Sequence, residues 1–231
     1  MKTLFIHLIS FALLSNGAVL NAQGTFQDLN FEEANLTPIA GSPYYPYAVT
    51  VANALPGWTV DYGDVQQTQI LYNNPSTGST AVTLLANGYG PPIDGNFSVL
   101  LQGGVVSGTP TAASISQTGM IPATAEYLTF EVGMNYGGSG TLDVSIGAQN
   151  IPLLALGTGP NYSLYGGNIP AWEDNQSEQL TISAPGLSGN WEIDDIYFST
   201  NVVASPEPSM VALSAMGGLL FGARKWFARR S

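Results

Sequence analysis

The sequence of 231 residues contains no cysteine, and its lysines, its arginines and its single histidine are confined to the two ends of the chain. From Gln23 to Ser205 there is no Lys, Arg, His or Cys side chain. This absence excludes Ser-His-Asp and Cys-His catalytic arrangements from the body, since both need a histidine. It also excludes a lysine Schiff base and a zinc site built on Cys or His ligands.

Charge of either sign is scarce, because Asp, Glu, Lys and Arg make up only 9% of the residues. Of the 16 carboxylates, only Glu207 lies outside the stretch from Gln23 to Ser205. Such an acidic body lacks the clustered Lys and Arg side chains that nucleic-acid binding requires. The chemistry that remains is that of carboxylates: glycoside hydrolysis by paired acids, or the binding of a hard cation by oxygen ligands.

Residues 1–22 are typical of a secretory signal peptide. Lys2 supplies the positive start, an apolar stretch runs from Leu4 to Leu14, and Ala22 is a small residue at the cleavage point before Gln23. The apolar stretch is short for a membrane helix, which needs about 20 residues. We therefore predict cleavage and export, and the alternative is an uncleaved anchor helix.

Residues 205–231 combine three elements at the C-terminus. Pro206, Glu207 and Pro208 precede an uncharged stretch from Met210 to Ala223. Basic residues follow that stretch, namely Arg224, Lys225, Arg229 and Arg230. We predict a short transmembrane helix, because snorkelling basic side chains and interfacial aromatic residues extend its usable length, and the basic end belongs on the cytoplasmic side. The alternative is a buried C-terminal core helix.

This order of a Pro-Glu-Pro motif, an apolar helix and a basic cluster resembles the PEP-CTERM sorting signal of exported bacterial proteins. The resemblance implies export followed by recognition by an exosortase, a membrane-bound processing enzyme. It implies a membrane-anchored form before processing. The final location would be the cell surface or an extracellular matrix, with exopolysaccharide as a partner.

The hydrophobic pattern of the body has a period of two. Leu128, Phe130 and Val132 alternate with other residues, as is typical of half-buried antiparallel strands. Similar runs, separated by Gly and Pro turns, predict further strands at Thr25–Phe31, Trp58–Asp61, Gln69–Tyr72, Ala81–Leu85, Phe97–Leu101, Ala113–Gln117, Leu142–Ile146, Ile151–Leu156, Leu180–Ser183 and Trp191–Ser199. We predict an all-β fold over residues 23–204, a β-sandwich of the jelly-roll type.

Several segments resemble the galactose-binding-like jelly rolls of exported bacterial proteins. They are Asp94–Gly104, Ala113–Thr118 and Trp191–Phe198, and Leu29–Glu33 and Leu55–Trp58 fit the first strands of that family. The resemblance implies one of three kinds of domain: a sugar-binding module, a calcium-stabilised adhesin or a domain without a known ligand.

In the last predicted strand, the alternation of apolar residues shifts by one position. Apolar residues keep one parity up to Ile193 and the other from Ile196 onward, and the change falls at Asp194 and Asp195. One simple strand cannot place all of these apolar side chains on one face. The strand is therefore either buried on both sides or interrupted by a β-bulge at the Asp pair.

The galactose-binding-like resemblance implies a structural Ca²⁺ ion that joins a carboxylate near the first strand to one near the last. In this sequence the matching residues are Glu32 or Glu33 and Asp194 or Asp195. Neighbouring acids without a Lys or Arg in the body need either solvent or a metal ion. The alternative is a solvated acidic edge that discourages pairing between sheet edges.

Aromatic residues in Gly- and Pro-rich stretches are the candidates for sugar contact. Tyr89, Tyr162, Tyr165 and Trp172 lie in such stretches and are predicted to stack on sugar rings, whose C–H faces are apolar. Tyr44, Tyr45 and Tyr47 form a further cluster in a segment broken by Pro. The alternative is that most of these rings simply cover the ends of the sandwich.

Three functions remain open at this point. The favoured one is an exported, non-catalytic surface or matrix protein whose jelly roll binds carbohydrate. The second is a glycoside hydrolase that uses paired carboxylates, which would have to meet at about 5–9.5 Å in a cleft. The third is a structural spacer without a ligand.

Overall fold

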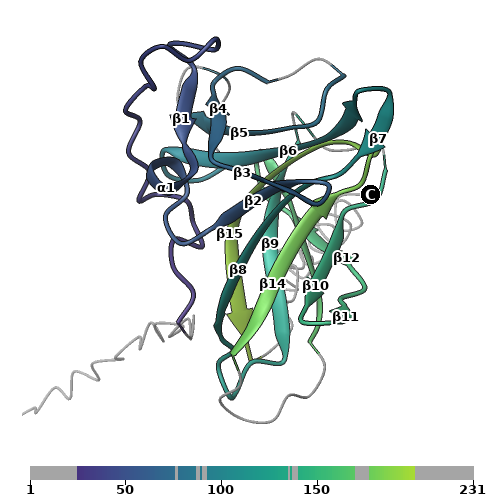
Figure 1. Ribbon diagram of the computed structural model, residues 1–231. Coiled ribbons are helices and arrows are strands. Elements are labelled where there is room, and N and C mark those ends of the chain that lie inside the picture. Colours follow the sequence, from purple (N-terminus) through teal and green to yellow (C-terminus); the bar gives the residue numbers. More distant parts are fainter. Residues whose placement is uncertain are drawn as a thin grey trace, which may run out of the picture.

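The computed structural model describes residues 25–75, 78–86, 89, 93–134, 136, 140–169 and 177–200. Over these residues the chain forms an all-β sandwich of two sheets (Figure 1). The predicted signal peptide (1–22) and sorting signal (205–231) lie outside the described residues. Within the part of the chain that is described, no helix is long and apolar enough to cross a membrane.

The first sheet has nine strands, and β15 and β6 lie at its centre. Its strands, in spatial order, are β1 (Ala48–Thr50), β4 (Gln69–Tyr72), β5 (Ala81–Ala86), β6 (Phe97–Val106), β15 (Gly189–Ser199), β9 (Tyr127–Gly133), β13 (Tyr162–Asn168) and β12 (Leu154–Thr158), and β7 (Thr109–Thr111) pairs with β6 off this path. All pairings are antiparallel except that of β4 with β5, which is parallel.

The second sheet has six strands, all paired in antiparallel fashion. In spatial order they are β11 (Gln149–Asn150), β10 (Asp143–Ile146), β14 (Ser177–Ala184), β8 (Ala113–Met120), β2 (Thr59–Tyr62) and β3 (Val65–Gln67). A single helical turn, α1 (Val51–Ala54), follows β1. The described part of the chain thus contains no helix of ordinary length, as the period-two pattern predicted.

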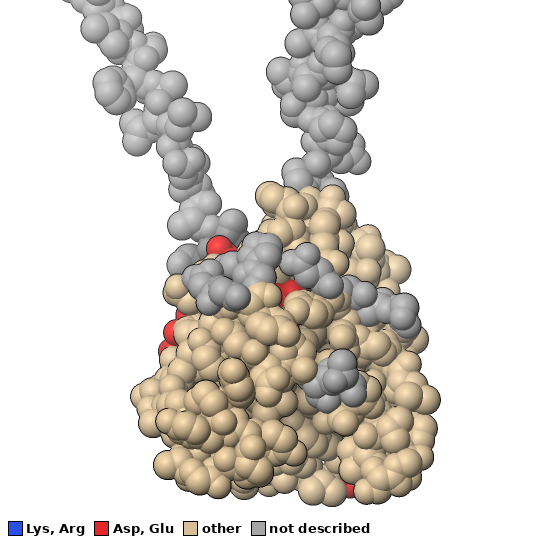
Figure 2. Space-filling model, turned by 90° about the horizontal axis from the view of Figure 1, so that it is seen from above, with Lys and Arg blue, Asp and Glu red and all other residues tan. Residues whose placement is uncertain are grey.

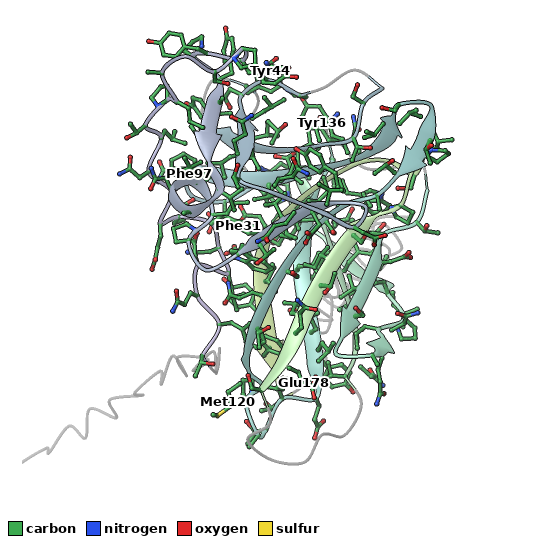
Figure 3. The ribbon with its side chains drawn as sticks, viewed as in Figure 1. Phe31, Tyr44, Phe97, Met120, Tyr136 and Glu178 are labelled. Atoms are coloured by element: carbon green, nitrogen blue, oxygen red, sulfur yellow. The ribbon has the colours of Figure 1, made fainter. Side chains whose placement is uncertain are left out.

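The core lies between the two sheets and is built from alternate residues of the strands. Phe130 and Ile193 of the first sheet and Ile115 and Ile182 of the second are all fully buried in one cluster. Phe31 lies inside this layer, as Figure 3 shows. Alternation therefore determines which side of each strand faces the core.

The segment predicted as a strand at Thr25–Phe31 is instead a series of turns. Asp28 and Phe31 adopt positive φ angles of 47° and 56°, which a strand does not allow. One local and one long-range hydrogen bond stabilise these turns: Asp28 Oδ1 accepts from Glu33 N–H at 2.9 Å, and Asp28 O accepts from Trp58 Nε1–H at 3.1 Å. The segment still lies beside the last strand, because Ile196 N–H donates to Leu29 O at 3.0 Å.

Of the two alternatives for the last strand, the structure shows the β-bulge, and residues 191–196 are buried on both sides of the strand as well. The register between β15 and β9 shifts between Asp194 and Tyr197, and Asp195 has a positive φ of 45°. The extra residue lets Ile193 and Ile196 both face the core, where each is fully buried. The carboxylates at the bulge are turned away from that core as a result.

Candidate functional site

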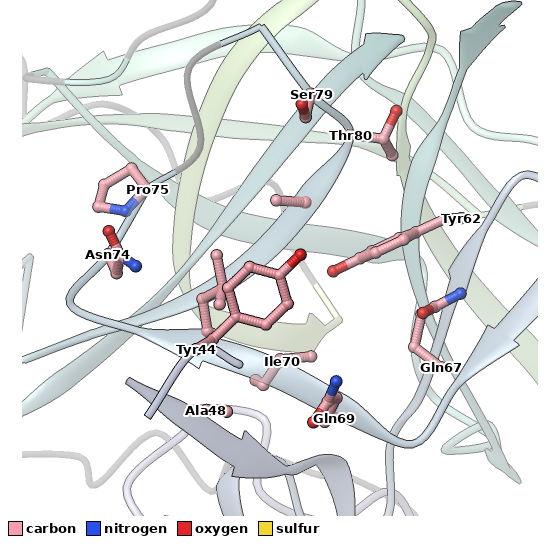
Figure 4. A pocket seen from close by; sticks show the side chains of 12 residues that line it. Tyr44, Ala48, Tyr62, Gln67, Gln69, Ile70, Asn74, Pro75, Ser79 and Thr80 are labelled. Carbon is pink, nitrogen blue, oxygen red and sulfur yellow. The ribbon is translucent and has the colours of Figure 1, made fainter. Parts of the chain in front are cut away.

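A cavity of about 570 Å³ opens at one edge of the sandwich, where β1, β4 and β5 approach β2 and β3 (Figure 4). The buried side chains of Ala48, Ile70 and Ala81 supply its apolar part. Tyr44 and Tyr62 point towards one another across it in Figure 4. We call this the tyrosine cavity.

The two tyrosines are held in different ways. Tyr62, at the end of β2, accepts a hydrogen bond at its Oη from Val82 N–H at 3.1 Å. Burial raises the pKa of Tyr62, so its hydroxyl stays neutral at physiological pH. Tyr44 lies in a turn in which its own N–H donates to Ser42 Oγ at 3.2 Å, and its side chain is 53% exposed. One ring is therefore fixed and the other is free to contact a ligand.

The polar part of the tyrosine cavity carries no charge. Among the described residues that line it, none is Asp, Glu, Lys or Arg, and the polar ones other than the tyrosines are Gln67, Gln69, Asn74, Ser79 and Thr80. Gln67 Nε2 donates to Val65 O at 2.7 Å, which leaves its Oε1 as an acceptor. Amides and hydroxyls beside aromatic rings suit a neutral ligand that has both hydroxyl groups and an apolar face.

A carboxylate cluster lies on the other face of the nine-stranded sheet, away from the core. Glu131 of β9 pairs with Asp194 of β15, and Asp194 Oδ2 accepts from Asp94 N–H at 3.4 Å. Asp195, in the bulge, interacts with Asp94 and with the hydroxyl of Tyr197. In Figure 2, which shows one face of the molecule, carboxylates are the only charged side chains among the described residues.

Burial determines the charge of this cluster. It raises the pKa of Asp194 to about 9 and that of Glu131 to about 7, and the neighbouring acids add to both shifts. The pKa of Asp195 is raised for the same two reasons. With no cation in the body, protonation is the available way to remove the buried charge. Near neutral pH, Asp194 is therefore predominantly a neutral acid, and Glu131 holds its proton far more often than an ordinary glutamate does.

The four predicted calcium ligands are engaged by the protein itself or lie apart. Glu32 Oε1 accepts from Asn96 N–H at 2.6 Å and from Phe97 N–H at 2.8 Å. Asp194 Oδ1 accepts from Asp195 N–H at 2.8 Å, and the Glu33 side chain is exposed. Among the described residues, no three Asp, Glu, His or Cys side chains form a group that could hold a metal ion. The structure thus shows no ready-made calcium site, and calcium binding stays a prediction.

Of the four predicted sugar-stacking residues, Tyr162 and Tyr165 do not share a face in the structure. Tyr162 and Tyr165 lie on β13 rather than in a loop, and they face opposite sides of it. Tyr162 bonds to Glu131 of the carboxylate cluster, whereas Tyr165 stacks on Phe130 in the core layer. Tyr89 is 41% exposed, and Trp172 lies outside the described residues. Their role in sugar contact therefore stays a prediction.

Sequence reasoning did not predict the tyrosine cavity, although it singled out one of its lining residues, Tyr44. The cluster of Tyr44, Tyr45 and Tyr47 was a visible signal in the sequence. Gln67 and Gln69 were missed, because isolated polar residues at the edge of a strand carry no distinctive pattern. Gln67 lies near Tyr62 through the pairing of β2 with β3, whereas Gln69, on β4, reaches the cavity from the other sheet.

Comparisons with known proteins give structural similarity alone. No model of a protein family matches the chain, and a search of curated proteins gives no match. Three solved structures are among those similar to it. The enzymatically active domain of tailspike protein 4 from bacteriophage CBA120 has a TM-score of 0.41 and 14% identity, over 76% of this chain and 21% of that one. The chain thus spans about a fifth of the tailspike's length.

The other two are carbohydrate-binding modules. TmCBM61, solved in complex with β-1,4-galactotriose, has a TM-score of 0.35 and 15% identity, over 78% of this chain and 99% of that one. TmCBM27, described for specific mannan recognition, has a TM-score of 0.30 and 11% identity, over 65% of this chain and 94% of that one.

Proposed function

We propose that this chain is a non-catalytic carbohydrate-binding protein and that the tyrosine cavity is its binding site. The observation that carries the proposal is the pairing of Tyr44 and Tyr62 over an uncharged lining of amides and hydroxyls. A sugar ring would place its apolar C–H face on the exposed Tyr44 ring, and its hydroxyls would bond to Gln67, Gln69 and Asn74.

The ligand we propose is a neutral glycan. Sugars that carry carboxylate or sulfate groups need a cation beside them, and from Gln23 to Ser205 the chain has none. The acidic body repels such anions as well, at low salt most strongly. Neutral polysaccharides avoid this repulsion.

The cavity does not support the hydrolase alternative. A glycosidase needs two carboxyl groups on either side of the scissile bond. None of the residues that line the tyrosine cavity is an acid. The carboxylate cluster lies on the outer face of the nine-stranded sheet, and Glu192 there is 3% exposed and accepts from Ser98 Oγ at 2.7 Å. Binding without turnover is the activity that this chemistry favours.

The test is affinity electrophoresis through gels that contain neutral or anionic polysaccharides. We expect retardation by at least one of galactan, mannan and hydroxyethylcellulose, and none by polygalacturonate. Tyr44→Ala should abolish the retardation. The matched control is Tyr45→Ala, since Tyr45 is 61% exposed and does not line the cavity. Equal migration of the wild type in every gel would favour the spacer, and release of reducing sugar would favour the hydrolase.

We also propose that the protein is exported and sorted through its C-terminal signal. The support is the sequence alone: residues 1–22, the motif Pro206, Glu207 and Pro208, and the basic residues after the apolar stretch. An exosortase would process the tail, and the body would then reside at the cell surface or in the matrix, beside exopolysaccharide. Replacing Pro206, Glu207 and Pro208 by Ala should leave the unprocessed chain in the membrane fraction. Normal processing of that variant would refute the sorting proposal.

The family assignment of the body belongs to the same proposal. The segments Asp94–Gly104 and Trp191–Phe198 resemble galactose-binding-like jelly rolls, and they form β6 with its preceding turn and most of β15. These are the two central strands of the nine-stranded sheet. An experimental structure with a bound oligosaccharide would test both the family and the site.

A further inference from the structure

A second cavity, of about 400 Å³, opens at the other edge of the sandwich. It lies between β10 and β11 of the six-stranded sheet and the β13 side of the nine-stranded sheet. Tyr165 and Trp191 line it, together with the buried side chains of Leu142, Val144 and Ile151. We call it the tryptophan cavity. Its size and its mixture of aromatic and apolar walls are those of small-ligand sites.

Trp191, one of the lining residues of this cavity, carries a buried hydrogen-bond donor without a partner among the described residues. The indole is 7% exposed, and the ring of Tyr165 meets it edge-on, with the ring centroids 6.2 Å apart. Its Nε1–H is buried and has no acceptor among the described residues. The indole nitrogen can only donate, and a buried donor without an acceptor is costly. A ligand oxygen that reached this nitrogen, after a small shift of the side chains that cover it, would remove that cost.

The rim of the tryptophan cavity indicates the charge of such a ligand. Asp143 and Asn150 are exposed there, and no lining residue is a cation. The carboxylate repels anions, whereas both side chains can accept hydrogen bonds from hydroxyls. Both cavities combine aromatic rings with a few polar groups, and the described residues that line them include no cation. They differ in that the tyrosine cavity has an uncharged lining, whereas the tryptophan cavity has an acidic residue at its rim. A neutral sugar fits both.

The two cavities lie far apart in the strand order. The tyrosine cavity is at the β1–β4–β5 end of the first sheet and the β2–β3 end of the second, and the tryptophan cavity is near the opposite end of each. No residue lines both cavities. We infer that one sandwich binds two separate segments of neutral glycan, one at each edge, and so cross-links polysaccharide chains. This inference rests on the proposed function and adds the second site and its consequence.

The first experiment counts binding sites. Isothermal titration would use the full-length protein in a zwitterionic detergent, because the head group of an alkyl glycoside would compete. The probes are galactotriose, cellotriose and mannotriose, which are short enough to occupy one cavity each. We expect two equivalents per chain for at least one probe. Tyr44→Ala should reduce this to one, Thr141→Trp should also reduce it to one by filling the second cavity, and the double variant should bind none.

The second experiment tests whether the indole N–H of Trp191 donates to the ligand. Trp191→Phe keeps an aromatic ring but removes the donor, and we expect a rise of about tenfold in the Kd of the second site only, since one hydrogen bond accounts for roughly that factor. In ¹⁵N NMR spectra, the Nε1–H signal that this variant lacks should shift on addition of the trisaccharide that binds. The wild type should raise the viscosity of a solution of the matching polysaccharide, and neither single-site variant should.

The outcomes separate the two proposals. A wild type that binds one equivalent, with all binding lost in Tyr44→Ala, overturns the second site and leaves the proposed function intact. One equivalent that survives in Tyr44→Ala but is lost in Thr141→Trp overturns the tyrosine cavity instead. Failure of all three trisaccharides and of their polysaccharides overturns both. The site that remains in each single variant shows that the variant is folded.

Discussion

At the scale of single residues, Glu131 shows how burial without a counter-charge determines protonation. It lies on the outer face of β9 opposite Asp194, and its Oε2 is buried without a hydrogen-bond partner among the described residues. Burial raises its pKa to about 7, above the ordinary value of 4.5. A raised pKa means that the folded state holds the proton more tightly than the unfolded state. The stabilisation is complete below pH about 4.5 and disappears as the pH rises through about 7.

The first prediction follows from the upward direction of the Glu131 pKa shift. Glu131→Gln mimics the neutral acid and keeps an oxygen for the Tyr162 hydroxyl, so it should match the wild type near pH 4. At pH 8 the variant should be more stable by roughly 1–2 kcal/mol, because the wild-type carboxyl has by then lost its proton and solvent screens part of the charge at this half-buried site. Urea unfolding at both pH values measures the difference. Equal stability of the two proteins at pH 8 would contradict the expected charge state.

The second prediction concerns Trp58, which lies 4% exposed beside Phe31. Its Nε1–H donates to Asp28 O in the turn that replaces the expected first strand. Trp58→Phe removes that donor, leaves Asp28 O with the bond from Phe31 N–H at 3.3 Å alone, and creates a small void. We expect a loss of roughly 1–3 kcal/mol of unfolding free energy. Tyr45→Phe, at an exposed ring, should change it by less than about 0.5 kcal/mol. A similar effect of both variants would count against a structural role for this bond.

At the scale of secondary-structure elements, the bulge of β15 is the feature with the clearest conformational demand. Asp195 has a φ of 45°, which Asn tolerates and β-branched residues do not. The third prediction is that Asp195→Val costs roughly 1–3 kcal/mol of stability. Asp195→Asn should be neutral or stabilising at pH 7, because it also removes a charge from the carboxylate cluster. Chemical unfolding in the presence of a chelator compares the two, and an equally stable Val variant would exclude a conformational cause.

Most strands could be predicted from alternation, and the exceptions have physical reasons. β4 was placed at its observed bounds, and β9 and β15 were placed within two residues at each end. β13 was missed, because its Gly-rich sequence buries few apolar side chains and reads as a loop. The segment 25–31 has strand-like alternation, but the bond from Glu33 N–H to the Asp28 side chain stabilises turns there instead.

At the scale of the whole molecule, the sandwich class could be predicted but the two cavities could not. Each cavity forms where strands far apart in the sequence meet: Tyr62 and Ile70 reach the tyrosine cavity from different sheets, as do Val144 and Trp191 in the tryptophan cavity. Periodicity shows which face of a strand is buried. It carries no information on which two sheet edges leave a gap between them.

The fourth prediction is the response of the whole domain to calcium. If Glu32 releases the Asn96 and Phe97 amides to bind an ion together with Asp194 or Asp195, millimolar Ca²⁺ should raise the Tm by several degrees through binding to the folded state alone. Asp194→Asn, Asp195→Asn, Glu32→Gln and Glu33→Gln test the four predicted ligands, and Asp143→Asn, at an exposed acid elsewhere, is the control. Thermal melts with Ca²⁺, with Mg²⁺ and with a chelator measure the shift. The same Tm under all three conditions would contradict the prediction of calcium binding.

The place of β15 also has a mechanical consequence. This strand is the last described element of the chain, yet it lies at the centre of its sheet, antiparallel to both β6 and β9. Tension applied beyond Ser199 therefore runs along the strand and loads the hydrogen bonds on its two sides in shear, all at once. A terminal strand at an edge would instead peel away one bond at a time. A chain tethered at its C-terminal end while its edge cavities hold polysaccharide would accordingly resist extension, and a single-molecule pulling measurement should find a high unfolding force from that end.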